Sequence, residues 1–132
     1  MTLGDSVQLR LLVPRDAERA DSLLLRVELK NLTARRIEAM IGGDPPAVDF
    51  EVRSQATGEL VWHALRGFVS LPISTYPLSP RDSVEFRRFW PLRSGDRSRV
   101  QTGTYIVGAS VPLFTRDGAM HVRLGVPLTV RE

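Results

Sequence analysis

Apolar and polar residues alternate along most of this chain with the period of two that is typical of half-buried β-strands. The clearest example is the segment 22–31, in which apolar residues occupy every second position. Leu23, Leu25, Val27 and Leu29 are expected to face one way, and Leu24, Arg26, Glu28 and Lys30 the other. Helical periodicity is nearly absent, and 16–21 is expected to form one helical turn at most. The pattern therefore predicts an all-β fold.

Turn residues divide the alternating pattern into about eight predicted strands. They are expected near 5–13, 22–31, 35–41, 48–54, 59–65, 82–91, 103–111 and 119–131. Several short strands without helices favour an immunoglobulin-like antiparallel β-sandwich, and a closed barrel is the alternative with the same pattern.

The segment 78–111 is the most informative part of the chain. It contains a proline-led turn, a strand, a polar loop and a second strand that opens on Gly103-Thr104-Tyr105. This order is typical of the late hairpin of an immunoglobulin-like sandwich. The predicted core residues of the two strands are Val84, Phe86, Tyr105 and Val107.

Glycine and proline mark the irregular positions. Gly58 is expected to take a positive φ in a hairpin loop, and Pro127 predicts an edge strand or a bulge. The run 42–46 is expected to cross from one sheet to the other. The segment 67–80 is apolar but contains three prolines, which exclude an ordinary central strand.

Length and composition favour one domain over residues 1–132, with a core that needs no disulfide. The absence of cysteine favours a reducing compartment. No apolar run approaches the ~20 residues of a membrane helix. Asp5 and Arg10 interrupt the stretch where a signal peptide would be apolar. A cytoplasmic location is therefore expected if Met1 is the native start, and a secreted or periplasmic one if a signal peptide was trimmed.

The net charge is +3, and Lys30 is the only basic residue that is not an arginine. The arginine clusters are expected to be solvated edges and loops, because no groove-reading module accompanies them. No nucleic-acid or membrane partner is predicted, and the pattern favours no particular oligomeric state.

The sequence shows no constellation that carries chemistry. His63 and His121 stand at outward strand positions without metal-ligand spacing around them. No nucleophile elbow or phosphate loop is present, so the chain is not expected to be an enzyme or to hold a metal or cofactor. Trp62 and Tyr105 are expected in the core, and one of Phe89 and Trp90 is expected to face outward.

Four blocks, in order, resemble one family. They are VELKNLTARRIE, VDFEVRSQATGELVW, YPLSPRDSVEFRRFW and TGTYIVGASV, within residues 20–112. Together they resemble the bacterial intracellular proteinase inhibitor family of the BsuPI type. The resemblance implies an immunoglobulin-like sandwich that inhibits a subtilisin-like serine protease. Arg81 departs from the pattern, which often has glycine after the proline, and it disfavours a turn that needs a positive φ there.

An inhibitor needs a rigid, extended segment that loses little entropy on entering the protease cleft. The segment 67–80 has this character, and Leu71 or Tyr76 is the candidate side chain for an apolar specificity pocket. Two alternatives stay open. In one, the segment covers an open end of the sandwich. In the other, the domain is a generic immunoglobulin-like interaction or assembly module without inhibitory activity.

Overall fold

The computed structural model describes residues 2–3, 7–18, 22–43, 48–64, 73–115 and 118–132. Every regular element in these ranges is a strand. In chain order they are β1 (Thr2–Leu3), β2 (Val7–Leu12), β3 (Asp16–Glu18), β4 (Leu23–Asn31), β5 (Ile37–Gly42), β6 (Asp49–Ser54), β7 (Leu60–His63), β8 (Ile73–Leu78), β9 (Ser83–Trp90), β10 (Gly103–Thr115) and β11 (Gly118–Arg131).

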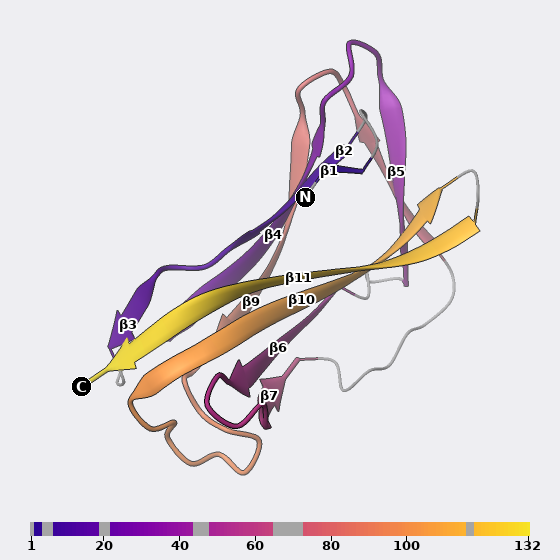
Figure 1. The fold of residues 1–132 in the computed structure, drawn as a ribbon. Coiled ribbons are helices and arrows are strands. Elements are labelled where there is room, and N and C mark those ends of the chain that lie inside the picture. Colours follow the sequence, from indigo (N-terminus) through magenta and orange to yellow (C-terminus); the bar gives the residue numbers. More distant parts are fainter. Residues whose placement is uncertain (1, 4–6, 19–21, 44–47, 65–72, 116–117) are drawn as a thin grey trace.

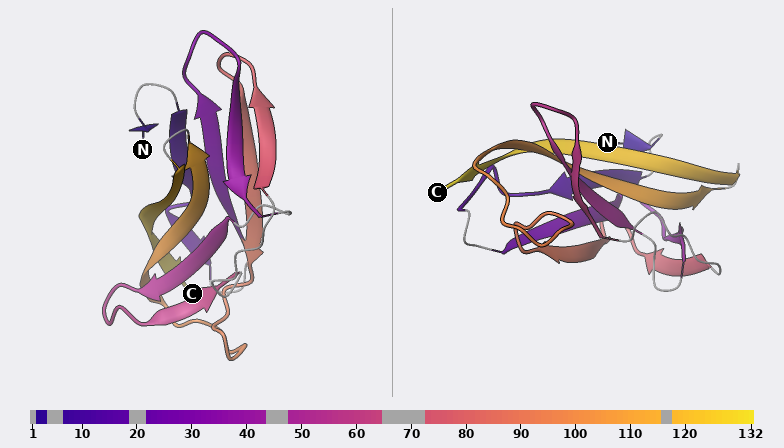
Figure 2. Two further views of the ribbon diagram at one scale, coloured as in Figure 1. Left: turned by 90° about the vertical axis from the view of Figure 1, so that its right-hand side faces the viewer. Right: turned by 90° about the horizontal axis from the view of Figure 1, so that it is seen from below.

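The described strands form two sheets, which confirms the predicted sandwich over the barrel. The first sheet has the order β1-β2-β4-β9 and is antiparallel throughout. The second has the order β3-β11-β10-β5-β8, and β6 pairs with both β10 and β7. Figure 1 shows the long β10–β11 hairpin crossing in front of β4 and β9. Figure 2 gives two further views of the same layers.

The core lies between the sheets and follows the predicted alternation. In β4, Leu25, Val27 and Leu29 are fully buried, while the residues between them are half-buried. Phe50 and Val107 face them from the second sheet. Burial of such side chains stabilises the fold by roughly 1.5–3 kcal/mol each.

The eight predicted strands are all present, and three further strands were missed. The segment 16–18 is strand β3 and not a helical turn, because the chain leaves the first sheet after β2 and pairs in parallel with 129–131 of β11. The segment 73–78 is strand β8, at the edge of the second sheet. The third is the two-residue β1.

The prediction for 42–46 was wrong. The strands before and after it, β5 and β6, both pair with β10, so the chain stays in the second sheet. β10 is long enough to hold both strands end to end along one side, which no local pattern indicates. Residues 44–47 themselves lie outside the described residues.

Two predicted special positions are confirmed. Gly58 has a φ of 74° in the β6–β7 loop. Pro127 lies opposite Ile106 of β10, and β3 pairs only further along, at 129–131, so this part of β11 is an outer strand among the described residues. A missing N–H is tolerated on such an edge.

Tyr105 makes the contact that is known as a tyrosine corner in immunoglobulin-like sandwiches. Its hydroxyl donates to the carbonyl oxygen of Gln101 at 2.6 Å. The ring is buried and packs against Trp90, at a centroid distance of 6.2 Å. Trp90 is fully buried, whereas Phe89 is 66% exposed, which settles which of the two faces outward.

Candidate functional site

The predicted contact segment 67–80 is described only from residue 73. Leu71 lies outside the described residues. Tyr76 lies on β8, half-buried, with its ring edge-on to Phe86 at a centroid distance of 5.4 Å. The exposed positions of this strand are Ile73, Thr75 and Pro77. The roles of Leu71 and Tyr76 in binding stay predictions.

A buried asparagine anchors the end of β8. Asn31 is fully buried, and its Nδ2 donates to the carbonyl oxygens of Arg35, Leu78 and Ser79 at 2.9–3.1 Å. Its Oδ1 accepts from the amide and the hydroxyl of Thr33 at 2.9 and 2.7 Å. One side chain therefore joins the end of β4, the following loop and the end of β8, although Asn31 and Leu78 are 47 positions apart in the chain.

The turn after β8 is closed by the same asparagine. Asp82 N–H donates to Ser79 O at 3.0 Å, and Arg81 N–H donates to Asn31 O at 3.1 Å. Arg81 has a φ of 70° after Pro80, which is the geometry of a type II turn. The sequence had indicated that arginine disfavours a positive φ here. The structure nevertheless places Arg81 in that region, since Asn31 and Asp82 hold both sides of the turn.

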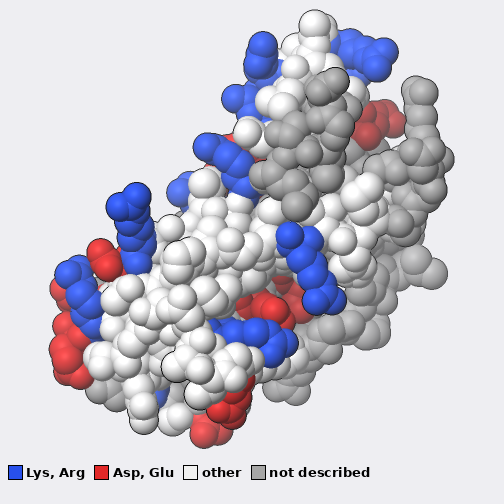
Figure 3. Space-filling view, in the orientation of Figure 1, with Lys and Arg blue, Asp and Glu red and all other residues white. Residues whose placement is uncertain are grey.

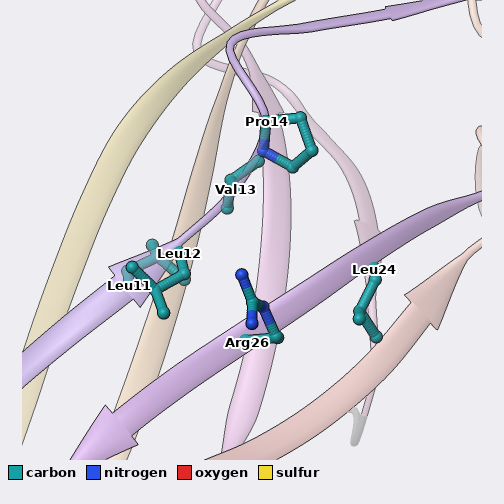
Figure 4. A pocket seen from close by; sticks show the side chains of 6 residues that line it. All are labelled: Leu11, Leu12, Val13, Pro14, Leu24 and Arg26. Carbon is teal, nitrogen blue, oxygen red and sulfur yellow. The ribbon is translucent and has the colours of Figure 1, made fainter.

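The outer face of the first sheet carries an apolar groove, which is not among the sites predicted from the sequence. Its volume is about 440 Å³, and it is lined by Leu11, Leu12, Val13, Pro14, Leu24 and Arg26. Figure 4 shows Arg26 lying between Leu12 and Leu24. Phe89 is the cross-strand partner of Leu24, so the two side chains are neighbours on the same face. We call the groove together with Phe89 the outer patch.

Two signals of the outer patch were present in the sequence. Leu24 occupies the outward phase of its strand, where the other positions are charged. Phe89 likewise follows Glu85 and Arg87 in the outward phase of β9. One apolar residue among outward-facing polar residues does not indicate a functional surface, but several that lie together do. Whether Leu24 and Phe89 lie together depends on the register of β4 against β9, which the sequence does not show.

Charged groups occupy the outer face of the first sheet on one side of the outer patch. The outward positions of β2, β4 and β9 hold Arg10, Arg26, Lys30, Arg87, Glu28 and Glu85, a net charge of +2. Arg87 forms an ion pair with Glu85 at 3.0 Å, and Arg26 contacts the same carboxylate at a longer distance of 3.5 Å. Because one carboxylate serves two guanidinium groups, the rim of the groove keeps an excess of positive charge.

The loop between β9 and β10 is tightly organised. Asp96 Oδ1 accepts from the hydroxyls of Ser94 and Ser98 and from the Ser98 amide. These bonds, that from Ser94 first, lower the pKa of Asp96 to about 2. Gly95 N–H donates to Val61 O at 2.9 Å and attaches the loop to β7. Its arginines are exposed, and on the face seen in Figure 3 the basic side chains do not merge into one continuous patch.

The described residues contain no group of three or more His, Asp or Glu side chains that could hold a metal ion. His121 is exposed and His63 is half-buried. Within the same ranges, no helix has the length and apolar character to cross a bilayer.

Comparison with known proteins shows likeness of fold only. No family model matches the chain. No curated protein matches it either. The solved structure of the alkylpurine DNA glycosylase AlkC from Pseudomonas fluorescens, bound to DNA with an abasic site analog, is similar with a TM-score of 0.50 and 14% identity. That match covers 98% of this chain and 32% of the glycosylase, so the chain spans about a third of that protein's length.

Two further structures are less similar. A CARDB domain from Pyrococcus furiosus matches 99% of this chain and 93% of its own, with 14% identity and a TM-score of 0.46. A β-glucosidase from Listeria innocua, in complex with glucose, matches 96% of this chain and 16% of its own, with 10% identity and a TM-score of 0.47. At sequence identities of 10–14%, the similarity concerns the fold and does not assign a function to this chain.

Proposed function

We propose that this domain binds another protein through the segment 67–80, and that the partner is a subtilisin-like serine protease, as the sequence resemblance implies. The observation that carries the proposal is the state of β8. It is an extended edge strand, and among the described strands it pairs only with β5. An extended segment at a sheet edge is a common way to present a peptide to a binding cleft.

The anchoring of β8 supports the same proposal. Its carboxyl end is held by Asn31, and Pro77 and Pro80 restrict the backbone on either side of Leu78. Ile73 is 40% exposed and is therefore a further candidate contact in the described part of the segment. A segment that is already ordered loses less entropy on binding.

The test is a titration of the purified domain into subtilisin with a chromogenic peptide substrate. We expect loss of protease activity in proportion to the domain added. Ile73→Ala and Tyr76→Ala should weaken the inhibition, and Met120→Ala, an exposed apolar residue on β11, is the matched control. Thermal melts are needed alongside, because Tyr76 packs on Phe86.

Full protease activity at a large molar excess of the domain, or rapid cleavage of the domain, would exclude inhibition of that protease. The second candidate function is a generic interaction module without inhibitory activity. It is favoured by one specific observation, the exposure of Phe89 beside an apolar groove on the other sheet.

A further inference from the structure

The geometry points to the outer patch as a second docking surface, for a protein segment that carries a large apolar side chain next to acidic residues. This inference goes beyond protease inhibition and does not depend on it. The outer patch lies on the first sheet, whereas β8, the described strand of the proposed protease-binding segment, belongs to the second sheet. The groove would take the apolar side chain, and Arg26 would bind the carboxylate.

Exposure of apolar surface is the first step of the argument. Phe89 has the largest exposed fraction, 66%, among the exposed large apolar residues of the described chain. Its neighbour Leu24 is one wall of the groove, and Leu12, Val13 and Pro14 form the other. Partly exposed aromatic residues beside an apolar pocket are typical anchors of protein interfaces.

The charge around the outer patch indicates the chemistry of the partner. The Arg26 side chain is 40% exposed, and among the described residues the one hydrogen bond and ion pair of its guanidinium is the 3.5 Å contact with Glu85, which leaves most of its five N–H donors available. A carboxylate that enters beside the groove would gain a charge-assisted hydrogen bond there. Acidic groups around the apolar side chain would also be complementary to the net +2 of this face.

The same charge argues against a second copy of this chain as the occupant. A symmetric dimer through this face would bring two surfaces of net +2 together, which is electrostatically unfavourable. Arg26 and Arg87 already face each other across β4 and β9, an arrangement that is unfavourable without Glu85 between them.

The experiment pans a phage-displayed library of random peptides on the purified domain and measures the affinity of the selected peptides by fluorescence anisotropy. We expect enrichment of Leu, Ile, Met or Phe flanked by Asp and Glu. Phe89→Ala should weaken binding by roughly tenfold, as for an interface anchor. Arg26→Gln should weaken it several-fold and reduce its dependence on salt.

Matched controls lie on the second sheet. Met120→Ala removes an apolar side chain that is 43% exposed, and Arg123→Gln removes an exposed arginine. Both should bind the selected peptides like the unaltered domain. All four variants change exposed or half-buried side chains, and circular dichroism melts should show that each is folded.

Three results would overturn the inference. They are no enrichment over an empty support, enrichment of basic peptides, and peptide affinities that Phe89→Ala and Arg26→Gln leave unchanged. Sedimentation equilibrium adds a fourth, because a dimer that Phe89→Ala dissociates would show the outer patch to be a contact between copies of the chain. The protease assay is independent, so either proposal can fail alone.

Discussion

Replacing Asn31 by alanine removes one side chain that joins three separate parts of the chain. Five hydrogen bonds are lost, three donated by Nδ2 and two accepted by Oδ1. The bond to Leu78 O is buried, and a buried carbonyl left without a donor costs about 1–3 kcal/mol. The others lie where water can partly replace them, at about 0.5–1 kcal/mol each. We therefore expect the free energy of unfolding to fall by roughly 3–7 kcal/mol.

The measurement is equilibrium unfolding in urea, followed by tryptophan fluorescence. A fall of this size is a large part of the roughly 5–15 kcal/mol that is usual for a domain. The unfolding midpoint should move to lower urea with an unchanged slope. Thr33→Val is the matched control, because it removes only the three hydroxyl bonds of the same loop, and at about 0.5–1 kcal/mol each it should cost about 1.5–3 kcal/mol.

Asn31→Asp separates the hydrogen-bond argument from simple packing. The aspartate has nearly the same shape, but its ionised carboxylate would face the carbonyl oxygens that now accept from Nδ2. Its pKa in the folded state should therefore lie above the unfolded value near 3.9. Folding stability should then be highest at low pH and fall as the pH rises through that raised pKa.

One result for Asn31→Ala would refute the anchoring argument. It is a free energy of unfolding within about 1 kcal/mol of that of the unaltered domain.

Three further outcomes are expected. Arg81→Gly should stabilise the domain by up to about 1 kcal/mol, since glycine adopts the φ of 70° without strain, whereas Arg81→Ala should not; equal urea midpoints for the two variants would contradict this. Tyr105→Phe should destabilise by about 1 kcal/mol, through loss of the 2.6 Å bond to Gln101, and an unchanged thermal midpoint would show that the bond adds nothing. Asp96 has a pKa lowered to about 2 by the bonds from Ser94 and Ser98, so the loop should be intact above the ordinary value near 3.8 and lose these bonds as the pH falls through 2. A carboxyl NMR titration with a midpoint near 3.8 would exclude that network in solution.

The sequence indicated two residues of the outer patch but not that they lie together. Leu24 and Phe89 stand out as apolar residues in polar phases, but they are 65 positions apart in the chain numbering. Only the β4–β9 register makes them neighbours, and only the exit of the chain after Leu12 brings Pro14 to the opposite wall. A groove depends on the packing of separate strands, and period-two patterns say nothing about which strands are adjacent.

What the sequence by itself determined is eight of the eleven described strands, their inward faces and the special positions of Gly58 and Pro127. These follow from local chemistry, because a residue's phase in a strand decides whether it is buried, and glycine and proline restrict φ directly. The tertiary structure alone decided the pairing order of the strands and the pairing of β5 and β6 with successive parts of β10. It also decided that β8 is extended although it contains a proline. It also placed Arg81 at a positive φ, against its own preference, because hydrogen bonds from distant residues outweigh a local cost of about 1–2 kcal/mol.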